Sequence, residues 1–177
     1  MQTPSRRAFL AMLAIVAATA RAAAETPQSF ALNNTPQPLP EIQFTDGDAK
    51  SRTLADFRGK VVLLNIWTTW CPECRQEMPT LDRLQAELGG TDFEVVALSM
   101  DRKGPEVVRK FFAETGVEHL ALNIDASSTA MLVLKAFGIP TTLLIDRHGR
   151  EIGRLIGPAD WDTPEMVEFI RSRIANH

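Results

Sequence analysis

The two cysteines of this 177-residue chain stand three positions apart, in the segment Trp70-Cys71-Pro72-Glu73-Cys74. A pair at this spacing can bind a metal, form a structural cross-link or cycle between dithiol and disulfide. A structural zinc site needs four ligands, and the histidines His119, His148 and His177 are too distant from the pair. A cross-link around so short a loop removes little chain entropy. Redox cycling is the interpretation that remains.

The pair lies where a buried strand is followed by a helix. Residues 61–67 are a near-continuous apolar run, which is typical of a strand buried on both faces. After Cys74, apolar residues recur at helical spacing up to Gly89. We therefore expect Cys71 at the helix N-terminus, where free amides and the helix dipole favour an exposed, attacking thiolate. We expect Cys74, one turn further on, to be the shielded resolving thiol.

Further sequence blocks accompany the pair in a fixed order. They are Asp56-Phe57-Arg58-Gly59-Lys60-Val61-Val62, Asn65-Ile66-Trp67-Thr68-Thr69-Trp70-Cys71, Glu77-Met78-Pro79, Gly138-Ile139-Pro140-Thr141-Thr142 and Ile145-Asp146-Arg147-His148-Gly149. Together they resemble the thioredoxin superfamily, specifically its TlpA-like and ResA-like extracytoplasmic thiol-disulfide oxidoreductases. The resemblance implies a thioredoxin fold, protein disulfide or dithiol clients, and catalysis without a metal or cofactor.

The order of the expected elements predicts the same fold class. Strands that alternate with helices favour parallel pairing, and the last two strands form an antiparallel hairpin. The expected strands are 41–45, 51–54, 61–67, 93–99, 121–124, 141–145 and 151–156. The expected helices are one that starts at Cys71 and stops at Gly89-Gly90, one at 104–115, one at 127–137 and one that opens at 163–164. The prediction is an α/β thioredoxin fold with a mixed central sheet flanked by helices and an N-terminal β-hairpin extension.

The first 24 residues are predicted to be an export signal. Ser5-Arg6-Arg7-Ala8-Phe9-Leu10 resembles a twin-arginine motif, a mild apolar stretch follows, and Ala22-Ala23-Ala24 offers a cleavage site. A Sec signal and a retained anchor are the alternatives, although the stretch is short for a membrane span. Residues 25–40 are predicted to be a proline-rich linker and residues 41–177 the thioredoxin-like domain. The expected location is the periplasm.

Charge limits the partners. The chain has a formal net charge of −3, and its first 24 residues carry three arginines and no acid, which leaves −6 for the remainder. An acidic domain argues against nucleic acid as a partner and permits basic protein clients.

A second segment is predicted to face the cysteine pair. Ile139-Pro140 resembles the cis-proline loop of the superfamily, and cis bonds are essentially confined to proline. The resemblance implies that Ile139 offers backbone hydrogen bonds to an extended client segment. Pro72 fixes the backbone at the helix start, and Trp70, together with Trp67, is expected to shield the site. Ordinary turn formation and core packing are the alternatives for these residues.

Glu77 is the third catalytic candidate. It follows Cys74 by three residues, which on a helix means the same face. ResA-like proteins carry an acid at this position, and a carboxyl near a buried thiol can accept and return its proton. Asn65 replaces the buried acid of cytoplasmic thioredoxins, which leaves more of this task to Glu77. The alternative is a solvated surface carboxylate.

Glu73 bears on the direction of the reaction. Its negative charge next to Cys71 disfavours the thiolate and so opposes the helix dipole. A poorly stabilised dithiol is the better reductant. The sequence therefore predicts a periplasmic disulfide reductase for cytochrome c or copper-centre maturation, supplied by a membrane thiol electron donor.

Two other functions fit the sequence less well. A peroxidase of the related fold has a Pro-x-x-x-Thr-x-x-Cys motif; Thr68 matches the threonine, but Leu64 replaces the proline. A copper chaperone could use the cysteine pair for Cu(I), but Met78 and Met100 are isolated, as core methionines are.

Overall fold

The computed structural model describes residues 30–177, and the predicted export signal lies outside this part of the chain. The elements in chain order are β1 (Ala31–Pro38), β2 (Gln43–Asp46), β3 (Ser51–Thr53), the 3-10 helix η1 (Leu54–Phe57), β4 (Val61–Trp67), α1 (Pro72–Leu88), β5 (Phe93–Ser99), α2 (Pro105–Thr115), β6 (Asn123–Ile124), α3 (Thr129–Val133), β7 (Thr141–Ile145), β8 (Arg150–Ile156) and α4 (Pro164–Asn176). Within residues 30–177, none of the helices combines the length and the apolar character needed to cross a bilayer.

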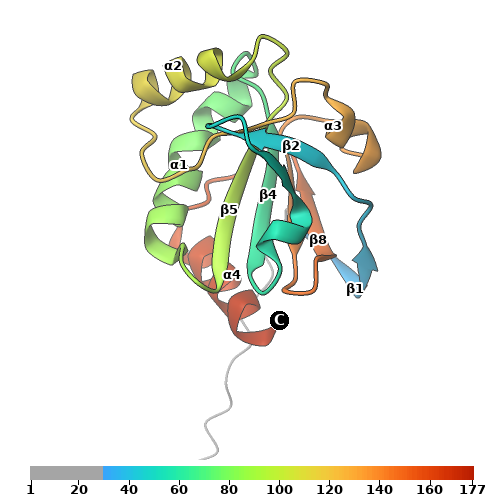
Figure 1. Cartoon of the computed structure of the whole chain (residues 1–177). Coiled ribbons are helices and arrows are strands. Elements are labelled where there is room, and N and C mark those ends of the chain that lie inside the picture. The colour runs from blue at the N-terminus through green and yellow to red at the C-terminus, as the bar shows by residue number, and fades with distance from the viewer. Residues whose placement is uncertain (1–29) are drawn as a thin grey trace, which may run out of the picture.

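The strands form one mixed sheet in the order β1-β8-β7-β4-β5-β6-β2-β3. β4 and β5 pair in parallel, as do β5 and β6, whereas β7 and β8 form an antiparallel hairpin beside β4. β2 and β3 make the predicted N-terminal hairpin at one edge. Helices cover both faces, and β4 and β5 run through the middle of the molecule, with α1 beside β5 (Figure 1). The predicted α/β thioredoxin fold is confirmed.

Alternate residues of β4 face different halves of the core. Val61, Leu63 and Trp67 belong to the core that packs against α1, α2 and α4. Val62, Leu64 and Ile66 belong to the core on the opposite face, with η1 and α3. Because side chains alternate along a strand, Asn65 points to the α1 side. The strand is buried throughout, as the apolar run predicts.

The redox helix begins as the sequence predicts. Cys71 is the N-cap of α1, Pro72 occupies the first turn, and the helix continues through Pro79 to Leu88. Proline suits the first turn because a backbone N–H at that position would have no intrahelical acceptor, so its absence costs no hydrogen bond.

The helix predicted for residues 127–137 is shorter in the structure. α3 covers Thr129–Val133, because Ser128 and Lys135 adopt left-handed conformations with φ of 59° and 54°. A left-handed residue ends the regular helix on each side.

The predicted linker overlaps a strand. Ala31–Pro38 form β1, which pairs with β8 at the edge of the sheet, with an irregularity between Leu32 and Gln37. Prolines are tolerated here because an edge strand has one row of backbone groups that faces solvent. A Cβ on Gly153 of β8 would lie 2.8 Å from the carbonyl oxygen of Ala31, so glycine permits this close approach. The linker prediction is corrected for residues 31–38.

Candidate active site

Cys71 and Cys74 form a disulfide at the N-terminus of α1, with their Cα atoms 5.3 Å apart. The backbone N–H of Cys74 donates to the Sγ atom of Cys71 at 3.1 Å. This amide is one of those that a helix start leaves free, and it would stabilise negative charge on that sulfur. Cys74 is fully buried, as expected. Cys71, expected to be exposed, is only 3% exposed in the oxidised protein.

The loop before β7 lies against Cys71. The Ile139–Pro140 bond is cis, as the sequence predicts. The carbonyl oxygen of Ile139 lies 3.9 Å from the Cys71 sulfur, so the structure brings these two predicted site residues together. The backbone N–H of Gly157 in turn donates to the carbonyl of Pro140 at 2.9 Å, which ties this loop to the end of β8.

Trp67 and Trp70, the two tryptophans of the redox motif, differ in their exposure to solvent. Trp67 is fully buried, and its ring stacks on Phe112 with centroids 5.9 Å apart. Trp70 is 69% exposed beside the disulfide. Trp67 is therefore a core residue, and Trp70 presents an apolar surface to whatever approaches the sulfurs. Glu73 is also exposed, and its Oε2 atom lies 3.7 Å from the Cys71 sulfur.

Glu77 is buried, with 1% of its surface exposed, so the solvated alternative is wrong. Its Oε1 atom accepts from the Asn65 side-chain amide at 2.8 Å. Its Oε2 atom accepts from the indole N–H of Trp161 at 3.1 Å and from the backbone N–H of Ala159 at 3.2 Å. Burial raises the pKa of Glu77 from 4.5 to about 7, and the three hydrogen bonds oppose that rise. The group can therefore exchange a proton near neutral pH.

A cavity of about 190 Å³ reaches Glu77 from the surface. It is lined by Gln76, Glu77, Pro158, Ala159 and Asp160, of which Gln76, Pro158 and Asp160 are exposed. The carboxyl is thus buried among protein groups but borders a route to water.

Sequence reasoning missed the partners of Glu77 on the loop after β8. Trp161 was not among the predicted site residues, although it is fully buried and contacts Glu77. Trp161 is 84 residues from Glu77, and no spacing rule connects them.

A second missed group holds the turn that leads into Cys71. The backbone N–H and the hydroxyl of Thr69 both donate to the buried carboxylate of Asp101, each at 2.8 Å. The Arg75 guanidinium donates to the Thr69 carbonyl at 3.0 Å. Asp101 follows β5 and Thr69 follows β4. The carboxyl ends of adjacent parallel strands meet at one edge of the sheet. The positions of Thr69 and Asp101 just after two such strands could therefore have predicted their contact from the sequence.

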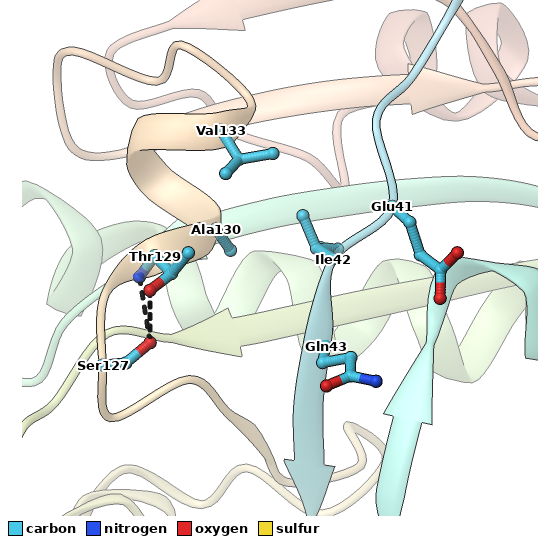
Figure 2. A pocket seen from close by; sticks show the side chains of 7 residues that line it. All are labelled: Glu41, Ile42, Gln43, Ser127, Thr129, Ala130 and Val133. Atoms are coloured by element: carbon cyan, nitrogen blue, oxygen red, sulfur yellow. Dashed lines mark hydrogen bonds between the residues drawn. The ribbon is translucent and has the colours of Figure 1, made fainter.

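Another cavity lies between the start of β2 and α3. It measures about 400 Å³ and is lined by Glu41, Ile42, Gln43, Ser127, Thr129, Ala130 and Val133. Figure 2 shows the side chains of these residues, with the Ser127 hydroxyl bonded to Thr129. This cavity contains none of the predicted site residues. Across residues 30–177, no group of three or more His, Cys, Asp and Glu side chains is arranged to hold a metal ion.

Comparison with known proteins agrees with this geometry. The Redoxin family matches residues 34–170. The chain belongs to the Redoxin family. It is 31% identical over 135 residues to the thiol-disulfide oxidoreductase ResA of Bacillus cereus, covering 76% of this chain and 75% of that one. It is 36% identical over 131 residues to the thiol:disulfide interchange protein DsbE of Pseudomonas aeruginosa, covering 73% of this chain and 69% of that one.

A solved structure confirms the fold of this Redoxin-family chain. The crystal structure assigned to a thiol:disulfide interchange protein DsbE of Chlorobium tepidum superposes with a TM-score of 0.70 at 26% identity, covering 80% of this chain and 98% of that one. The chain is a ResA- and DsbE-like thiol-disulfide oxidoreductase with a thioredoxin-like fold.

Proposed function

We propose that this oxidoreductase works as a reductase of protein disulfides outside the cytoplasm, in the maturation of cytochrome c or copper centres. The observation that carries the direction is the Glu73 carboxylate, 3.7 Å from the Cys71 sulfur. Negative charge there disfavours the Cys71 thiolate and so weakens the dithiol state relative to the disulfide. Such a pair gives its electrons to a client more readily than it takes them.

The proposed reaction follows from the positions of the two sulfurs. In the reduced protein, the Cys71 thiolate attacks a client disulfide, which forms a mixed disulfide and releases one client thiolate. The Cys74 thiolate then attacks Cys71, re-forms the disulfide seen here and releases the second client thiolate. Two electrons pass to the client, and a membrane thiol donor returns two electrons to the protein.

Glu77 takes part in the second step of this proposal. Cys74 is fully buried, and burial in apolar surroundings raises the pKa of a thiol and slows its ionisation. Glu77 lies one helical turn further along α1, and its pKa of about 7 suits a group that accepts and later returns a proton. The proton that leaves Cys74 would reside on the Glu77 carboxyl.

The client is proposed from the surface and from the resemblance. The exposed Trp70 ring and the backbone of Ile139 flank the sulfurs, which suits an extended client segment that contacts the loop through its main chain. The acidic net charge suits a basic client. The resemblance to TlpA-like and ResA-like proteins supports the extracytoplasmic location and the maturation role.

The direction is tested by equilibrating the protein with glutathione and quantifying free thiols. We expect a potential near that of thioredoxin, about −270 mV, and a value near that of DsbA, about −120 mV, would contradict the proposal.

The client is tested by expressing Cys74→Ser, which cannot resolve the mixed disulfide, and identifying the captured proteins. Cys71→Ser is the matched control, because it keeps one thiol but lacks the proposed nucleophile. Capture of cytochrome c or copper-site proteins by Cys74→Ser alone is the expected outcome.

A further inference from the structure

The two oxygens of the Glu77 carboxyl face different kinds of partners. Oε2 accepts from the backbone N–H of Ala159 and from the indole N–H of Trp161. Neither nitrogen can act as an acceptor in exchange, because an amide N–H and an indole N–H only donate. A proton on Oε2 would point at two donors. A proton that arrives on Glu77 therefore resides on Oε1.

Oε1 faces the side-chain amide of Asn65. In the structure the Nδ2 atom of Asn65 donates to Oε1 at 2.8 Å, an arrangement that suits a carboxylate. A protonated Oε1 would instead need an acceptor at that place. Asn65 carries one on the other edge of the same amide, the Oδ1 atom, and a half-turn of the amide exchanges Nδ2 and Oδ1.

The surroundings of Asn65 do not select one orientation. Its Oδ1 atom is buried and has no hydrogen-bond partner among residues 30–177, so nothing on that side holds the amide. Its other contact is the hydroxyl of Thr142, which Nδ2 reaches at 2.9 Å and which lies directly opposite Asn65 in the β4–β7 pairing. A hydroxyl accepts from an amide N–H and, after rotation, donates to an amide oxygen. Either orientation leaves one amide atom without a partner.

We propose that Asn65 is a positioning residue whose amide turns over with the protonation of Glu77. With the carboxylate, Nδ2 donates to Oε1 and to the Thr142 hydroxyl. With the carboxylic acid, Oδ1 accepts from Oε1–H and from the Thr142 hydroxyl. This inference rests on the proposed role of Glu77, since the proton gained at Oε1 is the one lost by the Cys74 thiol. No electrons move in this step.

Among the described residues, the hydrogen-bond partners of Glu77 are all neutral. Around it, α1 contributes Cys74, which does not titrate in the disulfide, and the loop after β8 contributes Asp160 across the cavity. β4 and β7 contribute the neutral Asn65 and Thr142. The raised pKa of Glu77 has burial as its cause, and no charged side chain contributes to it. A turnover of the Asn65 amide should therefore follow the titration of Glu77 itself.

The test is an NMR titration of the oxidised protein without client. The carboxyl carbon of Glu77 reports its protonation, and cross-relaxation between the Asn65 amide protons and the Thr142 side chain reports the amide orientation. We expect these cross-peaks above the Glu77 midpoint and their loss below it, with the same midpoint for both signals. Asn123 is the internal control: it is also buried, but its amide donates to the backbone carbonyl of Ala121, which cannot reverse. Its signals should not change.

Glu77→Gln gives the second measurement. The fixed donors of Ala159 and Trp161 should hold the carbonyl oxygen of the introduced side chain, which turns its amide N–H towards Asn65 and requires Oδ1 there. The Asn65–Thr142 cross-peaks should then be absent at every pH. Cross-peaks that persist through the wild-type titration, or that remain in Glu77→Gln, would overturn the proposal. These measurements do not include catalytic activity. If the Asn65 amide turns as expected but the protein fails to reduce client disulfides, only the proposed function is contradicted.

Discussion

The indole N–H of Trp161 donates to the Glu77 carboxylate at 3.1 Å, although the residues are 84 positions apart in the sequence. Both side chains are buried, with Trp161 fully so. The loop after β8 thus reaches back to the redox helix and contributes to the electrostatics of its carboxyl.

Trp161→Phe should raise the pKa of Glu77 further. The change removes a donor that favours the carboxylate, and we expect a rise of about one unit, since a hydrogen bond to a charged group contributes roughly 1.5–3 kcal/mol. The free energy of unfolding should fall by about 1–3 kcal/mol because of the lost volume and hydrogen bond. NMR titration of the Glu77 carboxyl carbon measures the first effect and denaturant unfolding the second.

Trp67→Phe is the matched control for this prediction. Trp67 is also fully buried, and its Nε1 atom has no partner among residues 30–177. It should lose stability to a similar or smaller extent and leave the Glu77 midpoint in place. Equal midpoint shifts in both variants would show that general loosening of the core, not the Trp161 bond, is responsible.

Glu77 should make the protein less stable as the pH rises. The folded protein keeps the Glu77 proton up to about pH 7, whereas the unfolded chain loses it near 4.5, so the folded state binds more protons between these values. The contribution of Glu77 to the free energy of unfolding is therefore fully present below pH 4.5 and is lost as the pH rises to about 7. The loss should be about 3 kcal/mol, from a shift of 2.5 units at 1.36 kcal/mol each.

Denaturant unfolding of the oxidised wild type and of Glu77→Gln across this range measures the effect. The difference between the two proteins removes the contributions of other titrating groups. Wild type should lose stability relative to Glu77→Gln as the pH rises. A difference that stays constant would mean that Glu77 titrates alike in the folded and unfolded states.

Glu73→Gln should make Cys71 more acidic. The carboxylate lies 3.7 Å from the Cys71 sulfur, and its removal favours the thiolate. Because Glu73 is exposed and screened by solvent, the thiol pKa should fall by about half a unit to one unit. The reduction potential should become less negative. The rate of Cys71 alkylation against pH in the reduced protein measures the change.

Glu87→Gln serves as the control because Glu87 lies at the other end of α1 and pairs with Arg171. Its alkylation profile should match that of the wild type. Superimposable profiles for Glu73→Gln and wild type would remove the physical basis for the reductase direction.

Thr69→Val should weaken the turn before Cys71. It leaves the Oδ1 atom of buried Asp101 without its hydroxyl donor, which costs about 1–3 kcal/mol of stability. Thr68→Val is the control, since the Thr68 hydroxyl is buried without a partner in the described chain and its loss should be nearly neutral. Denaturant unfolding compares the two, and an equal loss in both would contradict the role of Asp101.

The local parts of the site could be predicted from the sequence. The apolar run of β4, the N-cap position of Cys71 and the cis-proline loop each depend on neighbouring residues or on a short motif. Position along α1 also placed Glu77 on the side of Cys74. These features are fixed by residue spacing, which a single sequence records.

The remaining features depend on tertiary contacts. Burial of Glu77 requires Ala159 and Trp161 from a loop after the last strand. β1 forms because the edge of β8 accepts a strand that contains prolines, where composition alone indicated a linker. Cys71 contacts a loop 68 residues away. Periodicity and spacing carry no information on such long-range contacts.

Trp70→Ala should impair reactions with protein clients and spare those with small disulfides. The ring is 69% exposed next to Cys71, so its removal exposes no core and should change stability by no more than about 0.5 kcal/mol. Burying such a ring against a client contributes roughly 1.5–3 kcal/mol, which corresponds to a loss of about tenfold or more in kcat/KM for insulin reduction. Reaction with a small aromatic disulfide should change by less than about twofold, because it buries little apolar surface.

Leu132→Ala on α3 is the control, since Leu132 is 70% exposed as well. It should leave both rates unchanged. If Trp70→Ala slowed both substrates equally, Trp70 would act on the chemistry of the cysteines; if it slowed neither, clients would dock elsewhere.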